Sequence, residues 1–372
     1  MEERIYDYWV ATLQDGYMGN LVNIVKNAGG ARALYGLSRS ELVRRCRISD
    51  KLAGYIEDHR PDIRSLEEEY YRMQEDGVTY VNHSDPDFPE KLKNIPGSPY
   101  GIFVKGHIPD PQVPSVAIVG ARECSEYGRI MAEFFASRLA KEGVQVISGM
   151  AAGIDGIAQS AALNSGGKSY AVLGCGVDII YPARNRDLYR KLCNNGNGLI
   201  SEYAPGTPAV ARLFPPRNRI ISGLCDVLIV VEARAKSGTL ITVDMAIEQG
   251  RTVMVVPGRL TDNLSAGCLN LLYQGALPAT GIEAVLEQLG VNRQMGFSDL
   301  STPSPVKDDK IVPAELTCVL DVMNIEPQSI GQIAESAKIM PEQTMIILTR
   351  LEMEGLVREV YPGYYIRKLE LV

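Results

Sequence analysis

The chain has 372 residues, of which 45% are hydrophobic and 22% charged, and its formal net charge at pH 7 is −7. This composition is typical of a soluble globular protein with two or three domains. No apolar run reaches the roughly 18 residues that a transmembrane helix needs. The start of the chain lacks the basic head and apolar run of a signal peptide, so we expect a cytoplasmic protein with no membrane partner.

The seven cysteines are scattered and form no CxxC pair. That spacing argues against a zinc site and a disulfide framework, so we expect reduced thiols, no metal and no cofactor. The acidic balance at first disfavours a nucleic-acid partner, but the charge is unevenly distributed. The segment 184–219 has seven basic residues against two acidic ones, which suits either a polyanionic ligand or a solvated surface.

Residues 1–75 are expected to form a helical domain of the SAM-like or helix-hairpin-helix type, with glycine-containing turns at 15–20 and 27–31. Such turns can hold a DNA phosphate through backbone N–H groups, although a simple helix connection is the favoured interpretation. A proline-rich connector with a strand at 78–81 follows, and it begins the second domain, residues 76–290.

The core of this second domain, residues 115–280, alternates short apolar runs with helical patterns. Strands are expected at 116–120, 144–149, 169–174, 198–202, 226–233 and 252–258. This alternation predicts an α/β fold with an extended Rossmann-like, doubly wound and mostly parallel sheet. Almost every run ends in Gly or Ser, and ligands of such sheets bind at that edge, where helix N-termini converge.

Residues 291–312 are expected to be a linker to a third domain, residues 313–372. Helices are expected there at 314–323, 329–337 and 341–354, followed by a hairpin that turns at Pro362-Gly363. Three helices and a wing are typical of a winged helix. Its recognition helix has one basic residue, Arg350, so protein contact or simple packing is favoured over duplex DNA.

The most informative segment is 214–224, in which Arg217 and Arg219 flank Asn218 in an otherwise apolar stretch. Guanidinium groups in such a place are costly unless something anionic meets them. The later loop Lys236-Ser237-Gly238-Thr239 opens a helix and offers free backbone N–H groups as a phosphate seat. Together these features indicate a polyanionic ligand.

Several catalytic sites are not supported by the sequence. The loop after the first strand lacks the spacing of a nicotinamide site, and the run Gly166-Gly167-Lys168-Ser169 lacks the first glycine and the strand-to-helix order of an ATPase loop. All three histidines precede residue 115, so a Ser-His-Asp triad within the sheet is excluded. Glu232 is a candidate general base, although such acids more often cap a loop or pair with arginine, and Asp155 is a candidate helix N-cap.

The best enzymatic alternative is a nucleotide phosphoribohydrolase of the lysine-decarboxylase-like type, whose sheet this one resembles. Those proteins use a Pro-Gly-Gly-x-Gly-Thr-x-x-Glu loop. Here Gly238 and Thr239 are kept, but Thr242 stands where the catalytic Glu would be. We therefore expect no catalytic residue and no enzyme, while a nucleotide-sensing regulator stays open as a second alternative.

A set of motifs appears in order along the sheet domain. They include Val119-Gly120-Ala121-Arg122, Ser125-x-Tyr127-Gly128, Ser148-Gly149-x-x-x-Gly153-Ile154-Asp155, Gly174-x-Gly176-x-Asp178, Tyr181-Pro182-x-x-Asn185, Ser201-Glu202-Tyr203, Phe214-Pro215-x-Arg217-Asn218-Arg219 and Ser237-Gly238-Thr239. This series closely resembles the DNA-processing protein A family (DprA, also called Smf) over residues 115–280. The helical and winged domains fit the family more loosely.

The resemblance implies a single-stranded DNA-binding protein of natural transformation and recombination that protects incoming strands and helps load RecA onto them. It also implies a homodimer, with single-strand-binding protein as a further candidate partner. The DNA- or phosphate-binding residues are expected to be Gly120, Arg122, Ser125, Ser148, Gly149, Gly174, Tyr181, Arg184, Asn185, Arg217, Asn218, Arg219, Lys236, Ser237, Gly238 and Thr239.

Two departures from the family pattern affect this expectation. The family usually has Arg and His where Ala152 and Gln159 stand here, so one cation near the pocket rim is lost and the affinity and path of the strand stay open. Leu269 and Leu272 fall in the part of the family associated with dimer contacts, where they serve either the dimer or the core. Tyrosines 127, 181 and 203 lie in motif loops and are candidates for base stacking, with packing favoured for each.

Overall fold

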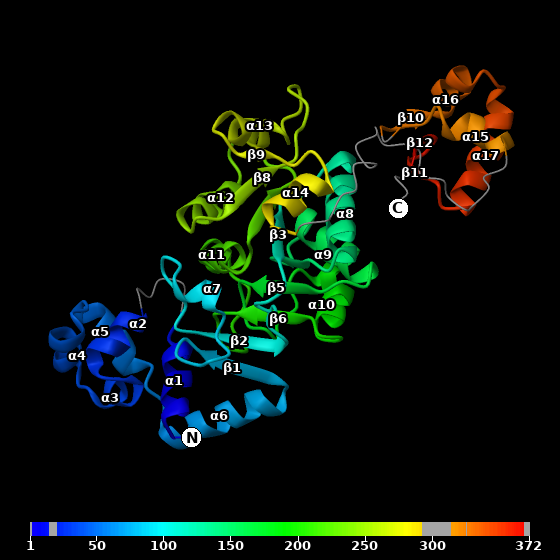
Figure 1. The fold of residues 1–372 in the computed structure, drawn as a ribbon. Coiled ribbons are helices and arrows are strands. Elements are labelled where there is room, and N and C mark those ends of the chain that lie inside the picture. Colours follow the sequence, from blue (N-terminus) through cyan, green and yellow to red (C-terminus); the bar gives the residue numbers. More distant parts are fainter. Residues whose placement is uncertain (1, 15–20, 292–313, 325, 368–372) are drawn as a thin grey trace. The chain divides into compact units, whose positions relative to one another are not determined.

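The computed structural model describes residues 2–14, 21–291, 314–324 and 326–367. The chain divides into two compact units, residues 1–291 and 292–372 (Figure 1). The expected glycine turn at 15–20 and, apart from Val291, the expected linker lie outside the described residues. No helix in the described part of the chain is long and apolar enough to cross a membrane.

The first unit begins with the expected helical region. Its helices are α1 (Glu2–Thr12), α2 (Leu21–Ala28), α3 (Ala31–Gly36), α4 (Arg39–Cys46), α5 (Asp50–Asp58) and α6 (Ile63–Glu75). A capping box between Ser38 and Glu41 starts α4, which satisfies N–H groups that a helix start leaves open. The core of the region contains the fully buried Trp9, whose indole N–H donates to the carbonyl of His59 at 2.8 Å.

The helical region shares its core with the sheet that follows. The ring of Tyr8 in α1 lies 6.0 Å from that of Phe103 in an edge-to-face arrangement. The Tyr80 hydroxyl donates to the carbonyl of Asp7 at 3.2 Å, and Arg4 pairs with Asp85 at 2.9 Å. These contacts attach α1 to the first strands of the sheet.

The described residues of the first unit form a nine-stranded sheet in the order β1-β2-β6-β5-β4-β3-β7-β8-β9. The strands are β1 (Val78–Asn82), β2 (Gly101–Gly106), β3 (Ser115–Val119), β4 (Gln145–Ser148), β5 (Ser169–Leu173), β6 (Gly198–Ser201), β7 (Val227–Val230), β8 (Thr252–Val255) and β9 (Leu277–Pro278). Strand β2 is antiparallel to both of its neighbours, and all pairs from β6 to β9 are parallel. The expected connector therefore extends the sheet by two strands, since β2 pairs with β6 and β1 pairs with β2.

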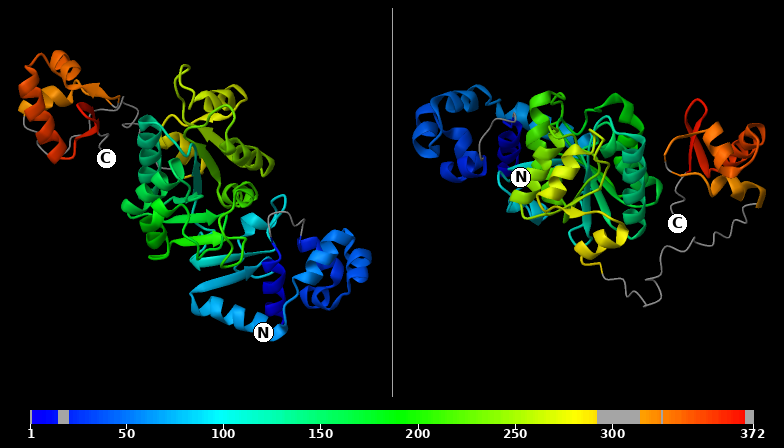
Figure 2. Two further views of the ribbon diagram at one scale, coloured as in Figure 1. Left: turned by 180° about the vertical axis from the view of Figure 1, so that it is seen from behind. Right: turned by 90° about the horizontal axis from the view of Figure 1, so that it is seen from above.

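Helices cover both faces of this sheet, which confirms the doubly wound architecture (Figures 1 and 2). The helices are α7 (Glu90–Lys93), α8 (Glu126–Lys141), α9 (Ile154–Asn164), α10 (Arg186–Leu192), α11 (Phe214–Leu224), α12 (Gly238–Glu248), α13 (Ala266–Tyr273) and α14 (Ile282–Gln288), with short 3-10 turns η1 (Ala183–Asn185) and η2 (Ala211–Leu213). One face packs against α8, α9 and α14, and the other against α7, α11, α12 and α13. The parallel strands are buried on both faces, which explains their continuous apolar runs.

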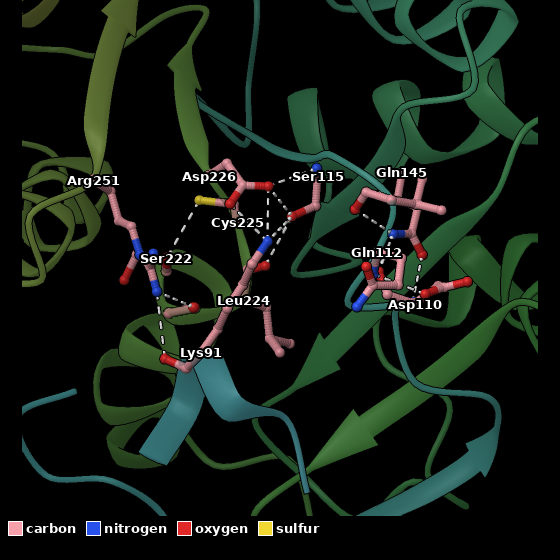
Figure 3. A network of polar contacts seen from close by, with 12 residues as sticks. Lys91, Asp110, Gln112, Ser115, Gln145, Ser222, Leu224, Cys225, Asp226 and Arg251 are labelled. Carbon is pink, nitrogen blue, oxygen red and sulfur yellow. Dashed lines mark hydrogen bonds and ion pairs between the residues drawn. The ribbon is translucent and has the colours of Figure 1, made fainter. Parts of the chain in front are cut away.

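At the edge where the parallel strands begin, a polar network ties α7 to β3 and β7 (Figure 3). The Lys91 ammonium donates to Asp226 at 2.7 Å and to the Ser115 hydroxyl at 3.0 Å. The Ser115 N–H also donates to Asp226, at 2.9 Å. Burial raises the pKa of Asp226, but the bonds from Lys91 and Ser115 outweigh this effect and hold the pKa below its ordinary value.

The second unit has the helices and the hairpin that the sequence predicts. Its elements are α15 (Ala314–Leu320), β10 (Gln328–Ser329), α16 (Ile330–Ala337), α17 (Pro341–Met353), β11 (Val357–Tyr361) and β12 (Tyr364–Arg367). The three strands form an antiparallel sheet in the order β10-β12-β11. Buried Leu348 and Leu351 of α17 pack with Val357 of the hairpin in one small core.

Candidate functional site

The strand order places a pocket at the point where the sheet changes direction. The chain runs from β3 through β4, β5 and β6 to one side, and then returns to place β7 on the other side of β3. Ligands of open α/β sheets bind at the carboxyl ends of strands at such a point. A pocket of about 240 Å³ lies there, which we name the switch-point pocket. Its lining residues are Val119, Gly120, Ala121, Arg122, Ala151, Asp155, Phe214, Pro215, Arg217, Asn218, Ile221, Ser237, Gly238, Thr239, Ile241 and Thr242.

The loop after β3 carries the exposed cation of the pocket, Arg122. Its guanidinium lies 5.8 Å from the ring centre of Phe214, a cation–π distance. The preceding Gly120 is required because a Cβ there would lie 2.7 Å from Ile154 of α9. These contacts hold the backbone close to α9 while the Arg122 side chain faces solvent.

A buried carboxylate fixes the start of α8 behind this loop. Glu232 is 1% exposed, and it accepts hydrogen bonds from the N–H of Ser125 at 2.9 Å and from the Ser125 hydroxyl. The same hydroxyl accepts from the N–H of Gly128 and so caps the helix. Glu232 thus caps a loop, as the favoured interpretation of its position expected.

The start of α12 forms a second wall of the pocket. Ser237 is the N-cap, and its hydroxyl accepts from the N–H of Thr239 at 3.2 Å. Nothing lies within 4 Å of the Cβ position of Gly238, so the backbone is open to a ligand on this side. The positive end of the helix dipole and the first-turn N–H groups face the same space as Arg122, an arrangement that attracts anions.

Beneath the pocket, α11 presents Arg217 to the protein interior. This guanidinium is 4% exposed and donates to the carbonyls of Gly149, at 2.9 Å, and of Val172. Burial lowers the pKa of Arg217, and the charge of Asp155 opposes this effect. Burial raises the pKa of Asp155, and the Arg217 charge and the Gly149 N–H oppose it. The charge that compensates buried Arg217 is therefore a carboxylate of the protein itself, Asp155.

Arg219 points away from the switch-point pocket, although it was expected there. Its Nη2 donates to Glu202 at 2.6 Å and its Nε to the carbonyl of Gly97 at 2.7 Å. Only 13% of the Arg219 side chain and 5% of the Glu202 side chain are exposed. Two residues of a helix that are two positions apart face different directions, so Arg217 and Arg219 do not share the lining of this pocket. Asn218, between them, lines the pocket.

The loops after β4 and β5 complete the rim. The exposed Tyr181 ring lies 5.4 Å from the Phe214 ring at an angle of 45°. The side-chain amide of Asn185 donates to the carbonyls of Met150 and Ala151 at 2.9 and 3.1 Å, so it shapes the β4–α9 loop rather than facing a ligand. Gly174 is required beside Phe214, because a Cβ there would lie 2.9 Å from the ring.

The structure thus brings some of the expected residues together and not others. Those that line the switch-point pocket are Gly120, Arg122, Arg217, Asn218, Ser237, Gly238 and Thr239. Those outside its lining are Ser125, Ser148, Gly149, Gly174, Tyr181, Arg184, Asn185, Arg219 and Lys236. Arg184 and Lys236 are exposed, and the buried Ser148 hydroxyl donates to the carbonyl of Ile118 at 2.7 Å.

Sequence reasoning did not assign the roles of two of the lining residues, Asp155 and Phe214. Asp155 was a candidate N-cap of α9, but Gly153 holds that position, and the buried Asp155 carboxylate offsets the charge of Arg217. Phe214, the first residue of its motif, was not singled out, although its ring contacts Arg122, Arg217 and Tyr181. Its place in the motif, three residues before Arg217, was the available signal.

The departures from the family pattern have local explanations. The Gln159 side chain is fully buried; its carbonyl accepts from the N–H of Met150 at 3.0 Å and its amide donates to the carbonyl of Tyr170 at 3.1 Å. Gln159 therefore supports the β4–α9 loop. Ala152 is 8% exposed and brings no charge to it. Tyr203 is fully buried with its hydroxyl on the carbonyl of Leu213, so it packs rather than stacks.

The last features to consider are possible metal ligands and the residues predicted for a dimer contact. Within the described ranges, no group of His, Cys, Asp and Glu side chains is placed to hold a metal ion. Leu269 and Leu272 are half-buried on α13, and Leu272 packs against the core of the α11–α13 face. The adjacent Tyr273 is 94% exposed. A contact between two copies stays a prediction.

Comparison with known proteins identifies the family. The model of the family described as DNA recombination-mediator protein A matches residues 79–290. The DNA processing protein DprA of Streptococcus pneumoniae is 42% identical over 204 residues, 55% of this chain and 72% of that protein. Protein Smf of Escherichia coli is 37% identical over 282 residues, 75% of each chain.

Solved structures agree. DNA processing protein A from Streptococcus pneumoniae superposes with a TM-score of 0.66 at 32% identity, covering 76% of this chain and 97% of that one. DNA processing protein A from Helicobacter pylori, a structure reported for its single-stranded DNA binding mode, gives a TM-score of 0.50 at 27% identity over 57% of this chain and 95% of that one. The family model and these relatives together show that the chain belongs to the DNA recombination-mediator protein A family, as its motifs indicated.

Proposed function

We propose that the chain binds single-stranded DNA at the switch-point pocket, with a phosphate between Arg122 and the start of α12. The observation that carries this proposal is the convergence of one exposed guanidinium, the amide of Asn218 and an open helix N-terminus on one space. The carboxylate in the lining, Asp155, is buried and its charge is opposed by Arg217, so it does not repel an anion strongly. Arginine forks and helix starts both suit phosphate oxygens.

The rim favours a strand whose bases are unpaired. Tyr181 is 44% exposed beside Phe214, and an exposed aromatic ring gives a base a stacking surface whatever its identity. Such stacking needs a base that is not already within a duplex. The related protein from Helicobacter pylori, whose structure is reported for single-stranded DNA binding, supports the same ligand class here.

The proposed role is recombinational rather than enzymatic. We propose that a homodimer in the cytoplasm protects incoming single strands during natural transformation and helps to load the RecA recombinase onto them, with single-strand-binding protein as a further partner. The two buried carboxylates support a binding protein. Glu232 accepts hydrogen bonds from Ser125, and the charge of Asp155 offsets that of Arg217, so neither serves as a general base. The buried Thr242 stands where the enzymatic alternative needs Glu.

Anisotropy titration of labelled oligo-dT, with duplex DNA and AMP as competitors and at two salt concentrations, tests this function. We expect oligo-dT to bind best and Arg122→Ala to weaken it about 5-fold at 0.1 M salt, because one phosphate contact contributes about 0.7 to the salt slope. The control is Arg64→Ala, which removes an exposed arginine of α6 outside the pocket. If AMP binds or is hydrolysed while oligo-dT does not bind, the phosphoribohydrolase alternative replaces the proposal.

A further inference from the structure

A second basic pocket lies at the opposite edge of the sheet, where β5 and β6 begin. It has a volume of about 500 Å³ and is formed by the turn before β5, the turn before β6 and the last turn of α10. We name it the far-edge pocket. Its lining includes three cations, Lys168, Arg190 and Lys191, and no carboxylate. The lysine belongs to the run Gly166-Gly167-Lys168-Ser169, which resembles a phosphate loop but has no role in the switch-point pocket.

The two lysines of this pocket are held by neutral oxygens. Lys168 donates to the carbonyl of Asn195, and Lys191 donates to the side-chain carbonyl of Asn164 at 2.9 Å. Neither forms an ion pair with a carboxylate in the described part of the chain. Each ammonium has three donors, so donors remain for a ligand. Two positive charges that no carboxylate compensates attract an anion.

The third cation is only weakly compensated. Arg190 lies 3.3 Å from Asp187 one turn away, and the two side chains are 68% and 89% exposed. An ion pair this exposed contributes little, so an incoming phosphate can displace Asp187 at low cost.

One helix connects the two pockets. Asn185, the N-cap of α10, donates to the carbonyl of Ala151, a lining residue of the switch-point pocket. The last turn of the same helix provides Arg190 and Lys191 to the far-edge pocket. Exposed Arg184 and Arg186 lie at its start, so basic residues occur at both ends of α10. From residue 184 to 191 a helix rises about 10 Å.

We propose that the far-edge pocket is a second phosphate site for the strand held at the switch-point pocket, which reaches it along α10. This inference rests on the proposed function, because it extends the path of the same ligand. It predicts that a short strand fills the switch-point pocket alone, whereas a longer strand also gains the contacts of Lys168 and Lys191. Affinity should therefore rise with length in steps that depend on these two charges.

The test compares oligo-dT of about 5 and about 20 nucleotides, a range that matches the site sizes of single-strand binders. The variant is Lys168→Gln with Lys191→Gln, since the glutamine amides keep donors for the two neutral oxygens and remove only the charge. The control is Lys26→Gln with Lys51→Gln, two exposed lysines of α2 and α5 outside both pockets. Thermal unfolding of both variants checks that the fold is kept.

We expect the far-edge variant to bind the long strand about 20-fold more weakly at 0.1 M salt, with the salt slope lowered by about 1.4 for two lost phosphate contacts. Its affinity for the short strand should equal that of the wild type. Equal loss on both lengths, or no loss on the long strand, would overturn the inference. Arg122→Ala separates the two proposals, because it should weaken both lengths; if it weakens neither, the switch-point site itself is refuted.

Discussion

Asp155 and Arg217 bind the two backbone polar groups of one residue, Gly149. The Gly149 N–H donates to the Asp155 carboxylate at 3.1 Å, and the Gly149 carbonyl accepts from the Arg217 guanidinium at 2.9 Å. Both charged side chains are less than 10% exposed. The β4–α9 turn beneath the pocket is thus fixed by a carboxylate and a guanidinium. Each charge counteracts the pKa shift that burial causes in the other group.

Removal of one member of this pair should strongly destabilise the fold. Asp155→Asn removes the charge that offsets the burial of Arg217 and weakens the acceptor of the Gly149 N–H, and losing such a charged hydrogen bond costs about 1.5–3 kcal/mol. Urea denaturation measures the loss. A loss below about 1 kcal/mol for Asp155→Asn would show that Arg217 does not depend on this partner.

Arg219 should matter for stability and not for the phosphate seat. Arg219→Ala removes the partner of Glu202, whose side chain is 5% exposed, and should cost about 3 kcal/mol. Its affinity for a short oligo-dT, measured where the variant is fully folded, should match the wild type. A loss of affinity as large as that of Arg122→Ala would instead place Arg219 on the strand.

Tyr181 should contribute by stacking. Tyr181→Ala should weaken oligo-dT binding by about 1–3 kcal/mol, whereas Tyr181→Phe should keep the affinity, because the ring and not the hydroxyl contacts the base. Tyr203→Phe is the matched control, since this ring is fully buried. Equal affinities of the Ala variant and the wild type would mean that no base lies on this ring.

Gly149 should tolerate no side chain. A Cβ at this position would lie 2.7 Å from the Arg217 Cζ, and neither group can move without breaking the hydrogen bonds described above. Gly149→Ala should therefore cost about 1–3 kcal/mol, the usual range for overpacking. Gly238→Ala, where nothing lies within 4 Å, should leave the urea midpoint nearly unchanged. Similar midpoints for the two variants would contradict the prediction.

Asp226 should make part of the stability dependent on acid pH. Its folded pKa lies below the ordinary value, so the stabilisation is present above the unfolded value of about 3.9 and is lost as pH falls through the folded value. Urea midpoints at pH 5 and pH 3 should fall further apart for the wild type than for Asp226→Asn. The control is Asp244→Asn, an exposed carboxylate of α12. Identical pH dependence of all three proteins would remove Asp226 from this role.

Periodicity predicted the sheet better than it predicted the contacts of single side chains. Apolar runs such as Val227–Val230 are buried on both faces, so their pattern has one explanation and the parallel strands follow from it. The connector was harder, because it joins the sheet only through the antiparallel pairing of β2 with β6, a long-range contact that local sequence does not encode.

The site shows the same limit. Arg122 and the α12 start lie in loops whose position follows from the strand order, so their proximity could be predicted. Arg217 and Arg219 point in different directions because of how α11 is rotated about its axis. The sequence of this segment does not predict which face of the helix turns inward. Two residues apart in a strand they would share a face, and two apart in a helix they do not. Their buried partners, Asp155 at the start of α9 and Glu202 after β6, come from distant parts of the chain.

The loops that form the switch-point pocket follow β3, β4 and β7, which are inner strands of the sheet. The edge strands are β1 and β9. Outer strands exchange their amide hydrogens first, because they open without disturbing the centre. A molecule that has frayed at either border, and has released the helical region or the two-residue strand β9, would still keep its phosphate seat. DNA binding would then be among the last properties lost as the protein unfolds.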